Sequence, residues 1–169
     1  MKKALLIYFQ DFHTVNDGGS LVNKRNAEMV TQILGKENVD FYFVNNTKKR
    51  SLLSLAFAAF LFPFGYFNGL TPNKLKSIIK MSNKYDYILI NTSLFGIIAK
   101  KLKENGYKGK VISFFHNIER YYYEARVSKK LPFRNIVINC AAKNDEYSIK
   151  HASISIGLCE RDCNILQKE

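Results

Sequence analysis

Three short apolar runs, each free of charged residues, constrain the fold of this chain more than any other feature. They are Ala4–Phe9, Tyr87–Ile90 and Val111–Phe115. None of them alternates between apolar and polar residues, as a strand with one face in water would. Such runs are typical of strands that are buried on both faces of a parallel sheet. We therefore expect these three runs to be central strands.

The segments between these runs have the residue spacing of helices. They alternate with two further strand-like runs, Val39–Val44 and Ala152–Ile156. The helical segments are 20–34, 73–81, 94–104 and 131–150. This alternation predicts an α/β fold, a Rossmann-like doubly wound parallel sheet with helices on both faces. The length of 169 residues and the hydrophobic content of 47% suit a single domain with its own core.

Polar residues follow directly after two of the expected central strands. Asn91 and Ser93 come after one strand, and His116, Asn117 and Glu119 come after the other. In open α/β sheets, ligands bind outside the carboxyl ends of the strands. These five residues are therefore candidates for a binding site. For each of them the alternative is an ordinary polar loop or a helix cap.

A glycine-rich segment, Asn16-Asp17-Gly18-Gly19, follows the first strand. Glycines there would let the backbone come close to a ligand. A plain turn is the alternative. The G-x-G-x-x-G fingerprint is missing from the sequence, so a dinucleotide cofactor is not supported.

Three cysteines, Cys140, Cys159 and Cys163, are too few and too scattered for a disulfide scaffold. We expect them to be reduced thiols in the cytoplasm. Two of them are spaced to share a helix face, but no convincing partner ligands accompany them. No metal site is expected.

Residues 51–73 form an uncharged stretch that follows Lys48-Lys49-Arg50. Its length approaches that of a transmembrane span, but proline and glycine interrupt it, and it lies between strands of one expected sheet. Two alternatives stay open: a packed core helix with an aromatic loop, or an interfacial segment that meets anionic head groups. For the interfacial alternative, the expected membrane contacts are Lys48, Lys49, Arg50, Phe57, Phe60 and Phe62.

The net charge of +12 favours an anionic partner, such as a phosphorylated substrate, a membrane surface or nucleic acid. The basic residues are scattered in short clusters, without an Arg/Gly-rich tail or a recognition-helix signature. Nucleic acid is therefore not the expected partner.

Four segments carry a resemblance to a known family. They are the first strand with Gly18-Gly19, the strand Tyr85–Asn91, the segment Phe114-Phe115-His116-Asn117, and the final Ala152–Asp162. In this order and spacing they resemble the N-terminal half of family-4 glycosyltransferases, retaining enzymes with the two-domain GT-B architecture. The family usually has Ser where this chain has Cys159.

The resemblance implies transfer of a hexose from a nucleotide sugar to a glycan or lipid-linked acceptor, in cell-surface polysaccharide synthesis. It implies no cofactor and no metal. Residues 1–169 correspond to the acceptor-side domain, so the donor-binding C-terminal domain is an expected partner and the isolated domain is expected to be inactive. The implied location is cytoplasmic, peripheral at the inner face of the membrane.

The resemblance also implies roles for individual residues. His116 would be catalytic, by contacting the transferred sugar or stabilising charge as the glycosidic bond breaks. The implied substrate-binding residues are Gly18, Gly19, Asn91, Ser93, Asn117 and Glu119. Tyr121–Tyr123 would stack on a sugar or form the packed face of a helix. The alternative function is a non-enzymatic α/β module that binds an anionic ligand, nucleic acid or a protein partner.

Overall fold

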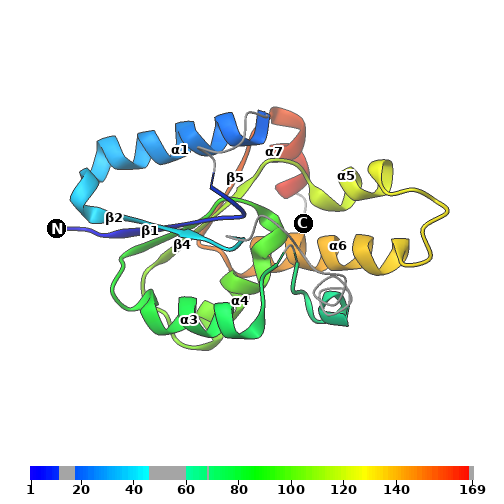
Figure 1. Cartoon of the computed structure of the whole chain (residues 1–169). Coiled ribbons are helices and arrows are strands. Elements are labelled where there is room, and N and C mark those ends of the chain that lie inside the picture. The colour runs from blue at the N-terminus through cyan, green and yellow to red at the C-terminus, as the bar shows by residue number, and fades with distance from the viewer. Residues whose placement is uncertain (12–17, 46–59, 68, 168–169) are drawn as a thin grey trace.

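The structure, a computed structural model, describes residues 1–11, 18–45, 60–67 and 69–167. Its strands are β1 (Ala4–Tyr8), β2 (Val39–Phe43), β3 (Tyr87–Ile90), β4 (Lys110–Phe115) and β5 (Ile154–Gly157). These five strands pair in parallel in the order β2-β1-β3-β4-β5 (Figure 1). The predicted parallel sheet is confirmed.

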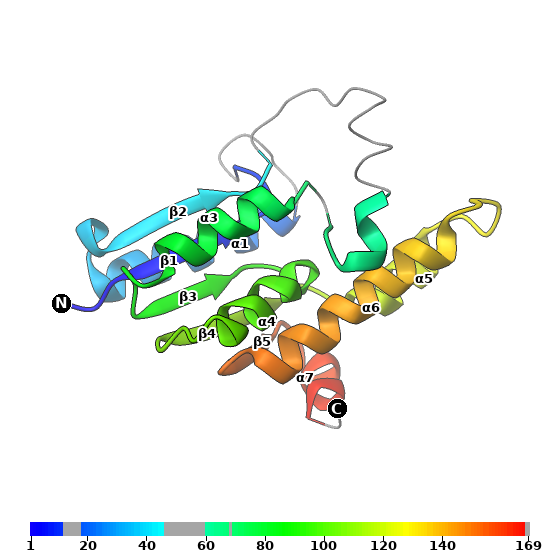
Figure 2. The same cartoon turned by 90° about the horizontal axis from the view of Figure 1, so that it is seen from below.

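Helices cover both faces of the sheet, as predicted (Figures 1 and 2). The α-helices are α1 (Gly18–Leu34), α3 (Pro72–Ser82), α4 (Gly96–Glu104), α5 (Glu119–Arg126), α6 (Arg134–His151) and α7 (Glu160–Leu166). The short 3-10 helices are η1 (Lys36–Asn38), η2 (Phe62–Phe64) and η3 (Ser93–Phe95). Helix α1 lies on one face, and α3 and α4 lie on the other.

Strand β1 shows why apolar and polar residues do not alternate in the apolar runs. Leu5 and Ile7 pack in the cluster that α3 and α4 contribute to, whereas Leu6 and Tyr8 pack in the cluster that contains Ala27 of α1. Successive side chains of a strand point to opposite faces, and both faces of this strand are covered. All five residues of β1 are buried for that reason.

Helices α4 and α6 approach each other closely at Gly96 and Asn144. A Cβ atom on Gly96 would lie 1.9 Å from the carbonyl oxygen of Asn144, so only glycine fits there. The Asn144 side chain is fully buried and joins three backbone segments. Its Oδ1 accepts from the Ile97 N–H at 2.9 Å, and its Nδ2 donates to the carbonyls of Gly65 at 3.0 Å and Cys140 at 2.9 Å. This one side chain therefore holds α4, α6 and the residues after η2 together.

The uncharged stretch at 51–73 is only partly within the described residues. Lys48, Lys49, Arg50 and Phe57 lie outside them. In the described part, Leu61, Phe67 and Leu70 are buried, whereas Phe60 is 67% exposed and Phe64 is 56% exposed. A fully packed core segment does not account for those two exposed rings. Across the four described ranges, no helix combines the length and the apolar character needed to cross a membrane.

Candidate functional site

The chain reverses its direction of winding beside β1. It passes from β1 through α1 to β2 on one side, and then through α3 to β3 on the other side of β1. The connections that leave β1 and β3 therefore lie on opposite faces of the sheet. In doubly wound sheets this switch point opens a crevice at the carboxyl ends of the strands, and ligands bind there.

A pocket of about 170 Å³ lies at this switch point. Its walls come from the residues after β1, β3 and β4 and from the first turns of α1. The lining residues are Phe9, Gln10, Gly19, Ser20, Asn23, Asn91, Thr92, Leu94, His116 and Glu119. Four of the residues predicted from the sequence, Gly19, Asn91, His116 and Glu119, thus meet around one cavity.

Three asparagines connect α1 to the end of β3 at this pocket. Asn26 Nδ2 donates to Asn91 Oδ1 at 2.9 Å, and Asn91 Nδ2 donates to Asn23 Oδ1. Asn26 and Asn91 are both buried. The Asn91 amide is therefore engaged by α1 and positions the pocket wall, while Asn23 lines the cavity itself. Asn23 and Asn26 were not predicted, although their spacing of three residues places them on one helix face.

His116 reaches the pocket because β4 ends immediately before it. The strand is anchored by the buried Phe114 and Phe115, and the His116 ring packs edge-on to Phe114 with centroids 5.4 Å apart. The ring is half-buried. A histidine held in this way can donate to or accept from a ligand in the cavity while its position stays fixed.

Glu119 and Asp145 form a pair of buried carboxyl groups beside the pocket. Glu119 is 5% exposed and Asp145 is 4% exposed. Burial, and secondly the charge of Asp145, raise the pKa of the Glu119 carboxyl to about 8. Burial also raises the pKa of Asp145, to about 6, although the hydrogen bond from the Arg120 N–H at 2.9 Å opposes the shift. At neutral pH the Glu119 carboxyl therefore keeps its proton and can donate a hydrogen bond.

The other predicted substrate-binding residues do not line the pocket. Gly18 is exposed and Gly19 follows it inside α1, so the expected loop glycines are instead the first helical residues. Ser93 is fully buried in η3, where its carbonyl accepts from the Ser148 hydroxyl at 3.4 Å. Asn117 is exposed to solvent and is not among the lining residues. Substrate contact by these three residues stays a prediction, and none of them lines this pocket.

The first turn of α1 forms part of the pocket wall and presents backbone N–H groups there. The first N–H groups of a helix have no intrahelical partners, and the helix dipole favours anions there. Gly19 and Ser20 line the cavity within this first turn, which holds no acidic residue. The pocket therefore joins a helix N-terminus to a histidine and a neutral acid.

The three tyrosines at 121–123 differ in their surroundings. Tyr123 packs edge-on to Phe67, with ring centroids 5.2 Å apart, as a buried helix face requires. Tyr121 and Tyr122 are each 40% exposed and lie against the guanidinium groups of Arg120 and Arg126. No tyrosine of this group lines the described pocket.

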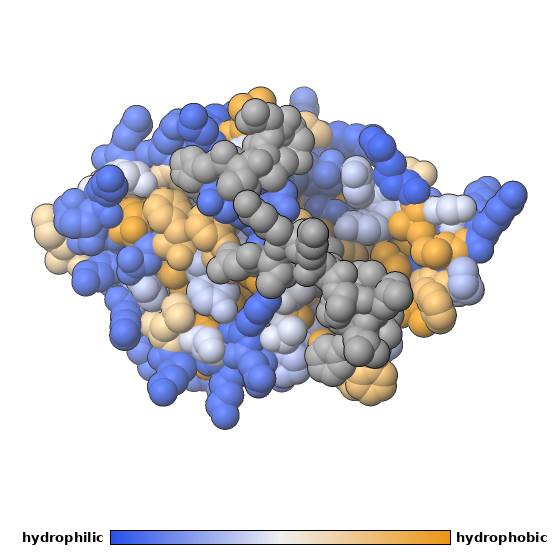
Figure 3. All heavy atoms as spheres, in the orientation of Figure 1, coloured by the Kyte–Doolittle hydropathy of each residue, from blue (hydrophilic) through white to orange (hydrophobic). Residues whose placement is uncertain are grey.

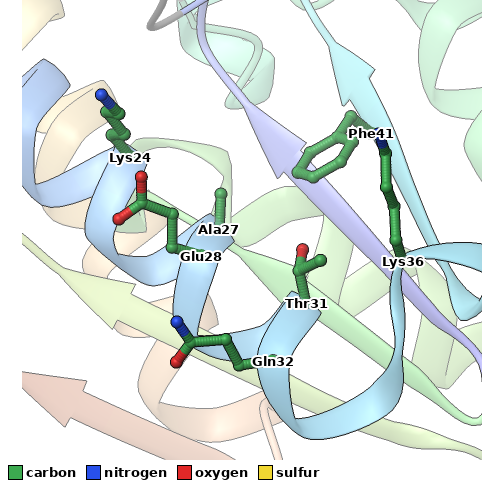
Figure 4. A pocket seen from close by; sticks show the side chains of 7 residues that line it. All are labelled: Lys24, Ala27, Glu28, Thr31, Gln32, Lys36 and Phe41. Atoms are coloured by element: carbon green, nitrogen blue, oxygen red, sulfur yellow. The ribbon is translucent and has the colours of Figure 1, made fainter.

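A second pocket, of about 290 Å³, lies between α1 and the edge strand β2 (Figure 4). The Phe41 ring points toward α1 there, and the remaining lining residues are Lys24, Ala27, Glu28, Thr31, Gln32 and Lys36. It is larger than the strand-end pocket but contains none of the strand-end side chains. Within the four described ranges, no three His, Cys, Asp or Glu side chains gather as metal ligands would.

Comparisons with protein-family models, with curated proteins and with solved structures find no match to this chain. The functional inference therefore depends on the residues of the strand-end pocket.

Proposed function

We propose that this chain is the acceptor-side domain of a retaining glycosyltransferase that takes its sugar from a nucleotide-sugar donor. The observation that carries the proposal is the meeting of Gly19, Asn91, His116 and Glu119 around one pocket at the switch point of the sheet. These residues come from three separate segments of the chain, and the resemblance to family-4 glycosyltransferases assigns a substrate-facing role to each.

The chemistry of the pocket fits this activity. Breaking a glycosidic bond to a diphosphate develops positive charge on the sugar ring and negative charge on the leaving group. The N-terminal N–H groups of α1 suit the anionic oxygens, while His116 suits a sugar hydroxyl or the developing charge. The protonated Glu119 can donate to a sugar hydroxyl without adding a buried negative charge.

The size of the pocket suits part of a nucleotide sugar rather than all of it. Its volume of about 170 Å³ is below the range of roughly 300–1,000 Å³ for pockets that enclose a drug-sized ligand. In the family that the chain resembles, a second domain binds the nucleotide. A glycan or lipid-linked acceptor would then approach from the cytoplasmic side of the membrane.

Replacing His116 by alanine should lower turnover about 10²-fold in the enzyme that joins this domain to a donor-binding domain, the usual size of effect when a charge-stabilising group is removed. The measurement is transfer from a nucleotide sugar under single-turnover conditions, together with the urea midpoint of the variant. Thr31→Ala, in the pocket between α1 and β2, serves as the control and should keep full activity. Unchanged turnover for His116→Ala, or its unfolding, would assign the histidine a structural role.

Ligand binding to this chain should be detectable at His116 by NMR. The chain has three histidines, so selective ¹³C labelling gives a simple spectrum, in which His151 on α6 is the internal control. We expect UDP-glucose and a free hexose to shift the His116 resonances and to leave the His151 resonances unchanged. The Kd should be roughly millimolar, because one domain alone cannot enclose the ligand as a closed two-domain cleft would. A duplex DNA that shifts His116 equally, with steep salt dependence, would favour nucleic-acid binding instead.

A further inference from the structure

Helices α5 and α6 run side by side, and the turn between them projects from the body of the domain (Figures 1 and 2). The Arg134 side chain closes the base of this hairpin. Its Nε donates to the Val127 carbonyl at 3.2 Å, and one terminal nitrogen donates to the Glu124 carbonyl at 2.9 Å. The turn is therefore tied to both helices and presents a defined surface.

Large apolar side chains are exposed on this hairpin and on the adjacent η2. On the hairpin, Leu131 is 45% exposed, Phe133 is 57% exposed and Ile136 is 40% exposed. Beside η2, the exposed rings of Phe60 and Phe64 pack with centroids 6.0 Å apart. We refer to these five side chains as the apolar face.

The two parts of the apolar face are neighbours. A hollow of about 270 Å³ lies between η2 and α6, lined by Phe62 and Pro63 on one side and by Ile136 on the other. Lys143 of α6 donates to the Pro63 carbonyl at 3.2 Å and holds the two elements together. Figure 3 shows hydrophobic side chains gathered on this side of the molecule, next to the hydrophilic tip of the hairpin. Exposed apolar side chains that gather on one surface are typical of an interaction site.

Basic residues predominate on the hairpin that carries most of the apolar face. No acidic residue occurs between Glu124 and Asp145, a span that contains Arg126, Lys129, Lys130, Arg134 and Lys143. Lys129 and Lys130 are exposed at the turn, directly before Leu131. The Arg126 guanidinium lies 5.5 Å from the centroid of the exposed Tyr122 ring, an aromatic group that suits the boundary between apolar and wet surroundings.

We propose that the α5–α6 hairpin tip and η2 form a surface that docks onto anionic lipid bilayers. Exposed aromatic and aliphatic side chains can enter the region between head groups and acyl chains, while the lysines stay at the level of the phosphates. The match between the exposed lysines of this hairpin and an anionic surface, beside exposed apolar side chains, selects a bilayer as the partner. The proposal does not depend on the transfer activity, and it adds the hairpin to the contacts expected from the sequence, of which Phe60 alone belongs to the apolar face.

The chain contains no tryptophan, so a single introduced indole reports on one position. Phe133→Trp should show a blue-shifted emission on adding phosphatidylcholine vesicles that contain 30% phosphatidylglycerol, and brominated lipids should quench it. Phe41→Trp, on the exposed edge strand at the other end of the sheet, should do neither. An equal response at both positions, or none at Phe133→Trp, would refute docking by the hairpin.

Charge and apolar variants test the two components separately. Lys129→Ser with Lys130→Ser should lower the vesicle partition coefficient about 30-fold, since each lysine at an anionic surface contributes about a fivefold factor. Lys24→Ser with Lys36→Ser removes the same charge beside α1 and should have a much smaller effect.

Leu131→Ser with Phe133→Ser should also weaken binding, and circular dichroism checks that each variant is folded. If both lysine double variants lose vesicle binding equally, net charge alone accounts for the binding. If Leu131→Ser with Phe133→Ser keeps full binding, these side chains do not insert into the bilayer.

Discussion

Replacing Asn144 by alanine is expected to destabilise this domain by about 4 kcal/mol, the largest single effect that the structure predicts. The substitution removes three hydrogen bonds at once and leaves the buried Ile97 N–H and the Gly65 carbonyl without the partner they have now. Each orphaned buried group costs about 1–3 kcal/mol, and water cannot easily replace a side chain that is 0% exposed. Domains of this kind have total stabilities of about 5–15 kcal/mol, so a large share would be lost.

Urea unfolding followed by circular dichroism measures this loss. Asn139→Ala is the matched control, because Asn139 is the same residue type on the same helix but is exposed, and its loss should stay within about 0.5 kcal/mol. A change below about 1 kcal/mol for Asn144→Ala would mean that water or a neighbouring side chain takes over its bonds.

Stability should fall as the pH rises from about 5 to about 8, by an amount on the order of several kcal/mol. The pKa of Glu119 is raised from 4.5 to about 8, and the pKa of Asp145 is raised from 3.8 to about 6. The folded state therefore holds more protons than the unfolded state across this window. The stabilisation is fully present below the unfolded pKa values near pH 4, and it is lost as the pH passes through the folded pKa values.

Glu119→Gln isolates the contribution of this carboxyl, because the amide cannot ionise. Free energies of unfolding at pH 5, 6.5 and 8 should change less with pH in this variant than in the wild type. His151 acts in the opposite direction, since burial lowers its pKa, and its contribution cancels in the comparison. Glu124→Gln, at an exposed position, should keep the wild-type slope. The same slope in Glu119→Gln would show that the Glu119 carboxyl is ionised in the folded protein at neutral pH.

The strands could be predicted because their signal is local. An uncharged run such as Val111–Phe115 cannot be solvated on either face, so burial in a parallel sheet follows from the sequence alone. The positions of His116 and Glu119 followed from the same logic, because a residue that comes directly after a buried strand must lie at the edge of the sheet.

The residues that were missed depend on contacts between distant segments. Asn144 and Asp145 lie in the middle of α6, where polar residues usually face solvent, and only the packing of α4 and α5 against that helix buries them. Ser93 was expected at the site but turns into the core within η3. No local pattern distinguishes these asparagine, aspartate and serine residues from exposed ones, because their partners are 25 to 55 residues away in the sequence.

The position of β1 has a consequence for synthesis on the ribosome. It is the first strand to emerge, yet it lies between β2 and β3, and Ala4 pairs with both Val39 and Tyr87. Translation proceeds at about 5–20 residues per second, so the 83 residues that separate Ala4 from Tyr87 take roughly 4–17 s. During that interval one edge of the apolar segment Ala4–Tyr8 lacks its partner strand. Nascent chains of this protein should therefore be ready clients for ribosome-associated chaperones until β3 has emerged.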